Sequence, residues 1–380
     1  MSYLTGTPTP TPAPTPTPAR TPNGTPAATR AVGIGVGRFS SAGSMTARRE
    51  GHTATLLANG MVLIAGGYDS GKVYASAELY NPATGKFSPT GSMIYPRSAH
   101  TATLLPDGLV LIAGGSGSLS APAELYDPAT GTFSPTGTMA ANPDRRGHTA
   151  TLLADGRVLL AGGDDGSAEL YDPATGIFRA TGRMGTRRSD ATATLLPDGR
   201  VLIAGGGIDG GVPFTSGLHS VSLASAELYD PATGTFSPTG SMATTRTHAT
   251  ATLLTDGRVL IAGGVGGIHG ERIPLASAEL YEPTTGAFTT TGPMSGARSR
   301  ATATLLFDGH VLLVGGSTAS ADLYDPVAGT SRPAGSMKML RAFHTATLLA
   351  DGRVLVAGGG GGPVGAANAY PLASAELYTP

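Results

Sequence analysis

The 380-residue sequence contains no cysteine and no tryptophan. Without cysteine the chain can form no disulfide and has no thiolate to act as a nucleophile or as a metal ligand. Charged residues make up only 13% of the chain, and the formal net charge is −1. This charge gives no general attraction for nucleic acid or for an anionic membrane surface. A run of 18 apolar residues is also missing, so we expect neither a nucleic-acid partner nor membrane insertion.

The first 30 residues lack the apolar side chains that a folded core needs. Thr and Pro alternate along most of this segment. Such a composition is typical of an extended, disordered tether. No apolar signal-peptide segment follows Met1. Thr/Pro tethers are typical of exported proteins, which favours an extracellular or cell-surface location without fixing it.

Glycine and proline are abundant, and from residue 31 onward one pattern recurs seven times. In its third copy, residues 145–163, two β-rich runs flank Asp155-Gly156, which predicts a type I′ hairpin. A Gly-Gly pair follows each hairpin, and successive pairs lie 43 to 58 residues apart. A third run then ends in Glu-Leu-Tyr or Asp-Leu-Tyr, and a fourth carries a Phe, except at Ser331. Each copy therefore predicts four short antiparallel strands.

Four strands per copy, a period of about 50 residues and a double glycine resemble the kelch repeat. The resemblance implies an all-β, seven-bladed β-propeller over residues 31–380, and we expect a monomer. The seventh copy ends without a fourth strand, whereas an unattached strand of that type occurs at residues 37–45. Residues 31–45 should therefore complete the blade formed by residues 338–380, which leaves no free sheet edge.

The segment Pro197–Gly206 is similar to stretches of the propeller of galactose oxidase and related copper-radical oxidases. Those enzymes bind copper through a tyrosine cross-linked to cysteine, together with further His and Tyr ligands. Because this chain has no cysteine, the resemblance is to the scaffold only. Kelch-type propellers also include bacterial sialic-acid epimerases, but we find no acid/base pair with an assigned geometry in this sequence. We expect no metal and no other cofactor.

An arginine precedes each first strand by three residues, and we expect these seven residues to encircle the mouth of the central channel. One hypothesis is an anion-binding ring, because a guanidinium binds carboxylates or sulfates in a planar fork. The other is that each arginine pairs with the carboxylate of a third strand, a structural role that sevenfold repetition favours. The candidates are Arg49, Arg97, Arg145, Arg188, Arg246, Arg298 and Arg341.

The connections after the Gly-Gly pairs differ in length and sequence, and they share one face of the predicted ring. Variable loops on a rigid scaffold are common binding sites. The candidates on this face are Tyr68, Asp209, Phe214, His219, His269, Glu271, Arg272 and Tyr370. Four further histidines each begin a first strand, but Ala occupies the equivalent place in three copies, so we interpret them as packing residues. Met residues that recur once per copy are interpreted as filler between blades.

Two functions remain open for this sequence. The first is a non-enzymatic module that presents its variable face to a glycan or to a protein. The second is a carbohydrate-active enzyme of the epimerase or lyase type, which would act on an anionic sugar at the channel mouth. We expect binding rather than catalysis, because no catalytic constellation is visible in the sequence.

Overall fold

The computed structural model describes residues 37–117, 121–141, 145–163, 165–209, 220–267, 272–363 and 370–380. These residues belong to one compact unit, Val36–Pro380. Their regular structure consists of β-strands, which confirms the all-β prediction. The predicted tether, residues 1–30, and its boundary with the propeller lie outside the described residues.

The third copy shows how one blade is built. β12 (His148–Leu152), β13 (Val158–Gly162), β14 (Ala168–Asp172) and β15 (Ile177–Ala180) pair antiparallel in chain order. Every residue of β13 is buried. Both faces of this strand are covered by neighbouring blades, which explains why its sequence is a continuous apolar run rather than an alternating one.

The hairpin between β12 and β13 differs from the predicted type I′ turn. Gly156 has a φ of 85°, but Asp155 is not left-handed. The Gly156 N–H donates to the Leu153 carbonyl at 3.0 Å, and the Leu153 N–H donates to the Arg157 carbonyl at 2.8 Å. This is a three-residue loop in which only the glycine needs a positive φ. Asp155 instead accepts the Arg157 N–H on Oδ1 at 3.0 Å.

Five other blades have the same strand order. Blade 1 contains β2 (Thr53–Leu56), β3 (Val62–Ala65), β6 (Ala77–Asn81) and β7 (Lys86–Pro89), and blade 2 contains β8 (Thr101–Leu104), β9 (Val110–Ala113), β10 (Glu124–Asp127) and β11 (Thr132–Pro135). Blade 4 contains β16 (Thr192–Leu195), β17 (Val201–Ala204), β20 (Ser225–Asp230) and β21 (Thr235–Ser241), and blade 5 contains β22 (Thr250–Leu253), β23 (Val259–Ala262), β26 (Ala278–Glu282) and β27 (Ala287–Thr291). Blade 6 contains β28 (Thr302–Leu305), β29 (Val311–Val314), β30 (Thr318–Asp325) and β31 (Thr330–Ala342).

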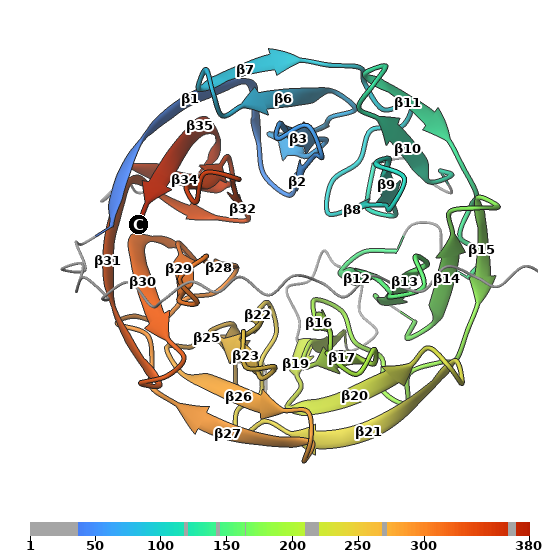
Figure 1. Ribbon diagram of the computed structural model, residues 1–380, viewed down its shortest axis with the longest axis vertical. Coiled ribbons are helices and arrows are strands. Elements are labelled where there is room, and N and C mark those ends of the chain that lie inside the picture. Colours follow the sequence, from blue (N-terminus) through green and yellow to red (C-terminus); the bar gives the residue numbers. More distant parts are fainter. Residues whose placement is uncertain are drawn as a thin grey trace, which may run out of the picture. The chain divides into compact units, whose positions relative to one another are not determined.

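The last blade is closed by a strand from the beginning of the chain. β32 (Thr345–Leu348), β33 (Val354–Ala357) and β35 (Tyr370–Thr379) are joined by β1 (Arg38–Arg49), which pairs antiparallel with β35. Phe39 is opposite Tyr378 in this pairing, and the two ring centroids are 5.1 Å apart. The predicted closure is thereby confirmed, and β1 lies on the outside of the ring beside β35 (Figure 1).

The hydrophobic core lies between neighbouring blades. Leu111 of blade 2 packs in one buried cluster with Val158 and Leu160 of blade 3. Met139, from the connection between these two blades, belongs to the same cluster, in agreement with the interpretation of the repeated methionines. Each blade therefore depends on its two neighbours, so the ring is stabilised as a whole.

Short additional strands extend the face that carries the connections after the Gly-Gly pairs. Two-residue and three-residue strands form small ribbons in blades 1, 4 and 5, and one further strand joins blades 6 and 7. They are β4 (Tyr68–Asp69) with β5 (Lys72–Val73), β18 (Gly207–Asp209) with β19 (Ser220–Ser222), β24 (Val265–Gly266) with β25 (Ile273–Pro274), and β34 (Gly360–Pro363) with both β31 and β35.

Candidate functional site

The seven predicted channel-mouth arginines are buried, with 0 to 3% of each residue exposed. Each forms an ion pair with the carboxylate on the third strand of its own blade, at 2.8 to 3.6 Å. Arg49, Arg97, Arg145, Arg188, Arg246, Arg298 and Arg341 therefore do not form an exposed ring of guanidinium groups, and the geometry is that of the ion-pair alternative.

Arg188 illustrates this ion pair. Its Nη1 donates to the carbonyls of Gly205 and Ser225 at 2.9 and 2.7 Å, and its Nη2 donates to Glu227 Oε1 at 3.0 Å. Burial lowers the pKa of Arg188, and the charge of Glu227 opposes that effect. The carbonyl of the equivalent Arg246 accepts the N–H of Gly206 in blade 4 at 2.8 Å. The repeated arginine thus holds its own blade with its side chain and the preceding blade with its backbone.

The four histidines that begin first strands link adjacent blades rather than forming a metal site. His148 Nε2 lies 3.1 Å from Thr101 Oγ1 of blade 2, and the other three make equivalent contacts with a threonine of the preceding blade. Burial lowers the pKa of each imidazole to about 3, so each is neutral near pH 7. Within the described residues, no three His, Cys, Asp or Glu side chains are grouped to hold a metal ion.

The predicted loop residues are only partly covered by the structure. Tyr68 and Tyr370 are 36% and 38% exposed, and the guanidinium of Arg48 lies 5.3 Å from the ring centroid of Tyr370. Asp209 ends β18, and Arg272 is exposed just before β25. The remaining four predictions lie outside the described residues: Phe214, His219, His269 and Glu271.

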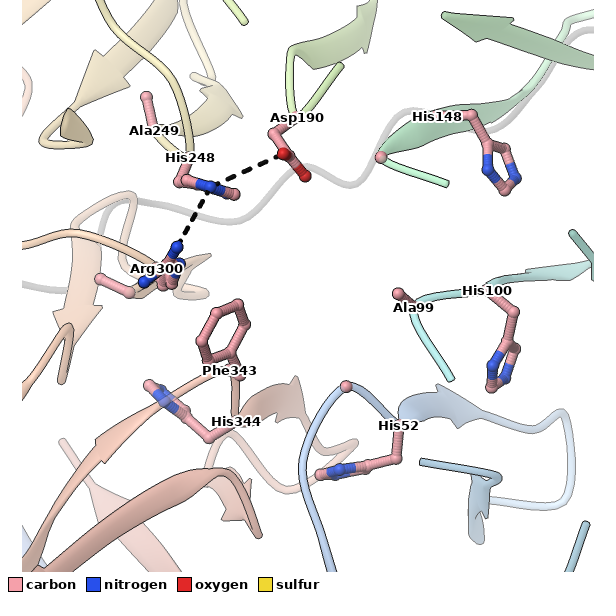
Figure 2. Close-up of a pocket in the computed structure, with 13 residues that line it drawn as sticks. His52, Ala99, His100, His148, Asp190, His248, Ala249, Arg300, Phe343 and His344 are labelled. Atoms are coloured by element: carbon pink, nitrogen blue, oxygen red, sulfur yellow. Dashed lines mark hydrogen bonds and ion pairs between the residues drawn. The ribbon is translucent and has the colours of Figure 1, made fainter. Parts of the chain in front are cut away.

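A cavity of about 330 Å³ opens where the seven first strands begin (Figure 2). Every blade contributes to its lining, so the cavity lies on the axis of the ring. Each blade contributes to the lining the residue that follows its repeated arginine by two positions. We call this place in the repeat the mouth position. The seven mouth positions are Gly51, Ala99, Gly147, Asp190, His248, Arg300 and Phe343.

All seven mouth positions have left-handed backbone conformations. Their φ angles are 61° at Gly51, 53° at Ala99, 59° at Gly147, 53° at Asp190, 53° at His248, 57° at Arg300 and 54° at Phe343. Glycine adopts this conformation without strain, whereas any other residue in it lowers the stability of the fold by roughly 1 to 3 kcal/mol. Five blades nevertheless carry a side chain at this position, and four of those side chains are polar, charged or aromatic.

Backbone hydrogen bonds join the mouth positions around the axis. The N–H of one mouth residue donates to the carbonyl of the preceding one at six of the seven junctions, at 2.8 to 3.4 Å. Between Ala99 and Gly147 this bond is not formed, and within the described part of the chain the Ala99 carbonyl and the Gly147 N–H have no other partner. The ring therefore has one open junction, which faces the cavity that both residues line.

The charged side chains of the cavity come from consecutive blades. His248 Nε2 lies 3.6 Å from Asp190 Oδ2 and 3.5 Å from Arg300 Nη2. The guanidinium of Arg300 lies 4.4 Å from the ring centroid of Phe343 (Figure 2). The opposite wall, from blades 1 to 3, presents only Gly51, Ala99 and Gly147 at the mouth positions. The cavity thus has one charged side, and a second side formed by small mouth residues together with the imidazoles of His52, His100 and His148 (Figure 2).

The electrostatics of the charged side are dominated by burial and by neighbouring cations. Burial lowers the pKa of His248; Asp190 raises it, and Arg300 and Arg272 lower it further. Burial also lowers the pKa of Arg300, as does Arg272, while Asp190 and Glu50 raise it. Arg272, one of the predicted loop residues that the structure describes, therefore acts on the cavity through its charge. Arg300 has no carboxylate within ion-pair distance among the described residues.

The mouth positions were not predicted from the sequence, because they belong neither to the repeated residues nor to the long loops. A mouth position is a single variable residue inside a constant motif, between the repeated Arg and the His or Ala that begins each first strand. Aligning the seven copies shows Gly, Ala, Gly, Asp, His, Arg and Phe at this place. That contrast between one variable residue and constant neighbours was the available signal.

None of the described residues forms a helix that is long and apolar enough to span a bilayer.

Comparisons with known proteins agree with the architecture. Residues 51–94 match the family model described as the Kelch motif. A fungal alcohol oxidase of the AA5 family, solved in complex with copper, is similar in structure, with a TM-score of 0.71 and 18% sequence identity over 91% of this chain and 77% of that chain. No curated protein matches the chain in a sequence comparison. The motif match, the repeated four-stranded blades and this structural likeness together identify the chain as a kelch-type β-propeller.

Proposed function

We propose that this propeller is a non-enzymatic binding module, which presents the face of the mouth positions and variable connections to a glycan or to a protein. The repeated ion pairs support this proposal by exclusion, because the arginines and the third-strand carboxylates bond one another inside the ring. The side chains that remain for recognition are those that differ between blades. They gather around the cavity and along the connections beside it.

The observation that carries the proposal is the conformation of Asp190, His248, Arg300 and Phe343. Gly51 and Gly147 fill equivalent places, so the fold itself requires no side chain there. Each side chain retained in a left-handed conformation destabilises the fold by roughly 1 kcal/mol or more. Strained residues are concentrated at functional sites because the strain is tolerated where the side chain is used.

The test compares the intact protein with a variant in which Asp190, His248, Arg300 and Phe343 are all replaced by Gly. We expect this variant to keep the ring, because glycine suits the backbone at each position, and to lose binding on a glycan array and on a protein-interaction array. Ala99→Gly is the matched control, since it relieves the same backbone strain without removing a recognition group. It should bind as the intact protein does. Equal binding by the fourfold variant would refute the proposal.

A second candidate is a carbohydrate-active enzyme that acts on an anionic sugar at the same cavity. The contact between Asp190 Oδ2 and His248 Nε2 at 3.6 Å favours it, because a carboxylate can orient an imidazole that acts as a base. In this reading Arg300 would neutralise the anionic group of the sugar. NMR spectra of acidic sugars incubated with the protein test this function. Turnover that is lost in His248→Gln would support the enzyme, and unchanged sugars would oppose it.

A further inference from the structure

We propose that the cavity recognises a ligand that carries a carboxylate and a secondary amide on one small framework. Arg300 binds the carboxylate, and the open junction between Ala99 and Gly147 binds the amide. This inference rests on the proposed binding function and specifies the chemistry of its ligand.

Arg300 is the residue that binds the carboxylate of the proposed ligand. The repeated arginines each have a carboxylate partner, as do the hairpin arginines such as Arg258 with Asp256 at 2.6 Å. Arg300 is partly buried at the cavity, yet among the described residues it has only the long contact with His248 and the stacking on Phe343. A guanidinium that contacts an aromatic ring without an ion-pair partner still has N–H donors for a planar anion. Arg272 adds positive potential at the same side.

The open junction between Ala99 and Gly147 is the place that binds the amide of the proposed ligand. At six junctions a mouth N–H meets a mouth carbonyl, but the Ala99 carbonyl and the Gly147 N–H lack such a partner within the described residues. An unpaired carbonyl and an unpaired N–H on neighbouring blades are complementary to the N–H and the C=O of a secondary amide. Ala99 is exposed and Gly147 is half-buried, so water reaches both backbone groups in the free protein, and a ligand amide that bonds both groups at once replaces that water.

Arg300 and the open junction line one cavity, with small mouth residues and the imidazoles of His100 and His148 on the amide side and charged residues on the other. A volume of about 330 Å³ is at the lower end of small-molecule sites. The ligand is therefore compact, such as an N-acylated amino acid, the last residue of a peptide or an N-acylated sugar acid. These sources share the same two groups and are separated by the probes below. Asp190 is available to accept a hydroxyl group of a sugar.

The experiment uses the full chain and a matched series of three probes, observed by ligand NMR. N-acetylglycine carries both groups, N-acetylglycinamide lacks the carboxylate, and acetoxyacetate replaces the amide N–H by an ester oxygen. We expect N-acetylglycine to bind, and each of the other two probes to bind roughly tenfold more weakly or worse. N-acetylneuraminate and an N-acetylated dipeptide then identify the source. Equal binding of the three probes, or no binding of N-acetylglycine at about 10 mM, would overturn the inference.

Two protein variants test the residues themselves. Arg300→Gly should strongly reduce the preference for N-acetylglycine over N-acetylglycinamide, because the carboxylate then loses the guanidinium that lines the cavity. Gly147→Ala should weaken binding of all amide probes, because a Cβ there would lie 2.9 Å from the Asp190 nitrogen and 3.0 Å from Asp190 Oδ1. Gly60→Ala is the matched control, since Gly60 also has a positive φ but lies in a hairpin outside the cavity, where an added Cβ meets no atom within 4 Å.

These outcomes separate the inference from the broader proposal. If the fourfold glycine variant loses array binding but the intact protein binds the three probes equally, only the proposed carboxylate-and-amide chemistry of the ligand is overturned. The probe series uses the unmodified protein, so it decides the inference even if a variant fails to fold.

Discussion

Replacing His148 by Ala should make the propeller less sensitive to acid. Burial lowers the pKa of this imidazole to about 3 in the folded state, whereas an unfolded histidine has a pKa of 6.5. Between these values the unfolded chain binds a proton that the folded chain does not, so stability decreases as the pH falls from about 6.5 towards 3. At about pH 5 the loss is about 2 kcal/mol for one such imidazole and about 8 kcal/mol for four.

His148→Ala is a mild change, because Ala191, Ala249 and Ala301 occupy the equivalent place in three blades. The variant should lose some stability at about pH 7.5, since the bond to Thr101 is gone. Its further loss between about pH 7.5 and pH 5 should be smaller than that of the original protein by about 2 kcal/mol. Urea unfolding followed by far-UV circular dichroism at both pH values measures this difference.

The reverse substitution provides the control. Ala191→His places an imidazole opposite Thr149 of blade 3, so it should add acid sensitivity of similar size if the imidazole becomes buried and neutral. Equal losses of stability on acidification in the original protein and in His148→Ala would refute the reasoning, because the imidazole would then be protonated equally well in both states.

Two further substitutions test the interior of the ring. Arg246→Ala should lower the stability by about 3 to 5 kcal/mol, because it leaves a buried carboxylate without its cation. Arg258→Ala, which removes a partly exposed hairpin ion pair, should lower it by about 1 kcal/mol. Similar unfolding midpoints for the two variants would contradict the structural role of the buried pair. Ala42→Thr should raise the stability by about 1 kcal/mol, because among the described residues the Tyr80 hydroxyl has no hydrogen-bond partner, whereas five equivalent tyrosine hydroxyls each bond a threonine at 2.8 to 3.0 Å. An unchanged or lower melting temperature would show that the added hydroxyl does not reach Tyr80.

The blade and its closure could be predicted because the information is local and repeated. Each copy carries four strand-like runs separated by turn residues, and sevenfold repetition averages out the ambiguity of any single run. The unattached strand at residues 37–45 was recognisable because it matches the fourth strand that the last copy lacks. The hairpin type was predicted wrongly, because Asp-Gly fits both a two-residue turn and the three-residue loop observed, and the register of the strands selects between them.

The candidate site was less accessible to sequence reasoning. The repeated arginine was conspicuous, but whether its guanidinium pointed towards the axis or towards Glu227 and its equivalents depended on packing between blades. The sevenfold count favoured the structural role, and the geometry agrees with it. Arg300 was not predicted as a site residue, because it follows the repeated Arg298 by two positions in a short connection.

By itself the sequence determined the repeat, the strand content and the way in which the ends meet, since these follow from hydrophobic periodicity and turn chemistry within about 50 residues. Tertiary structure alone decided the site. Asp190 and His248 are 58 residues apart in the chain, and His248 and Arg300 are 52 apart; they come together only because closure of the ring directs the start of every first strand to one axis. Convergence of this kind is a property of the closed ring, and no single copy of the repeat contains it.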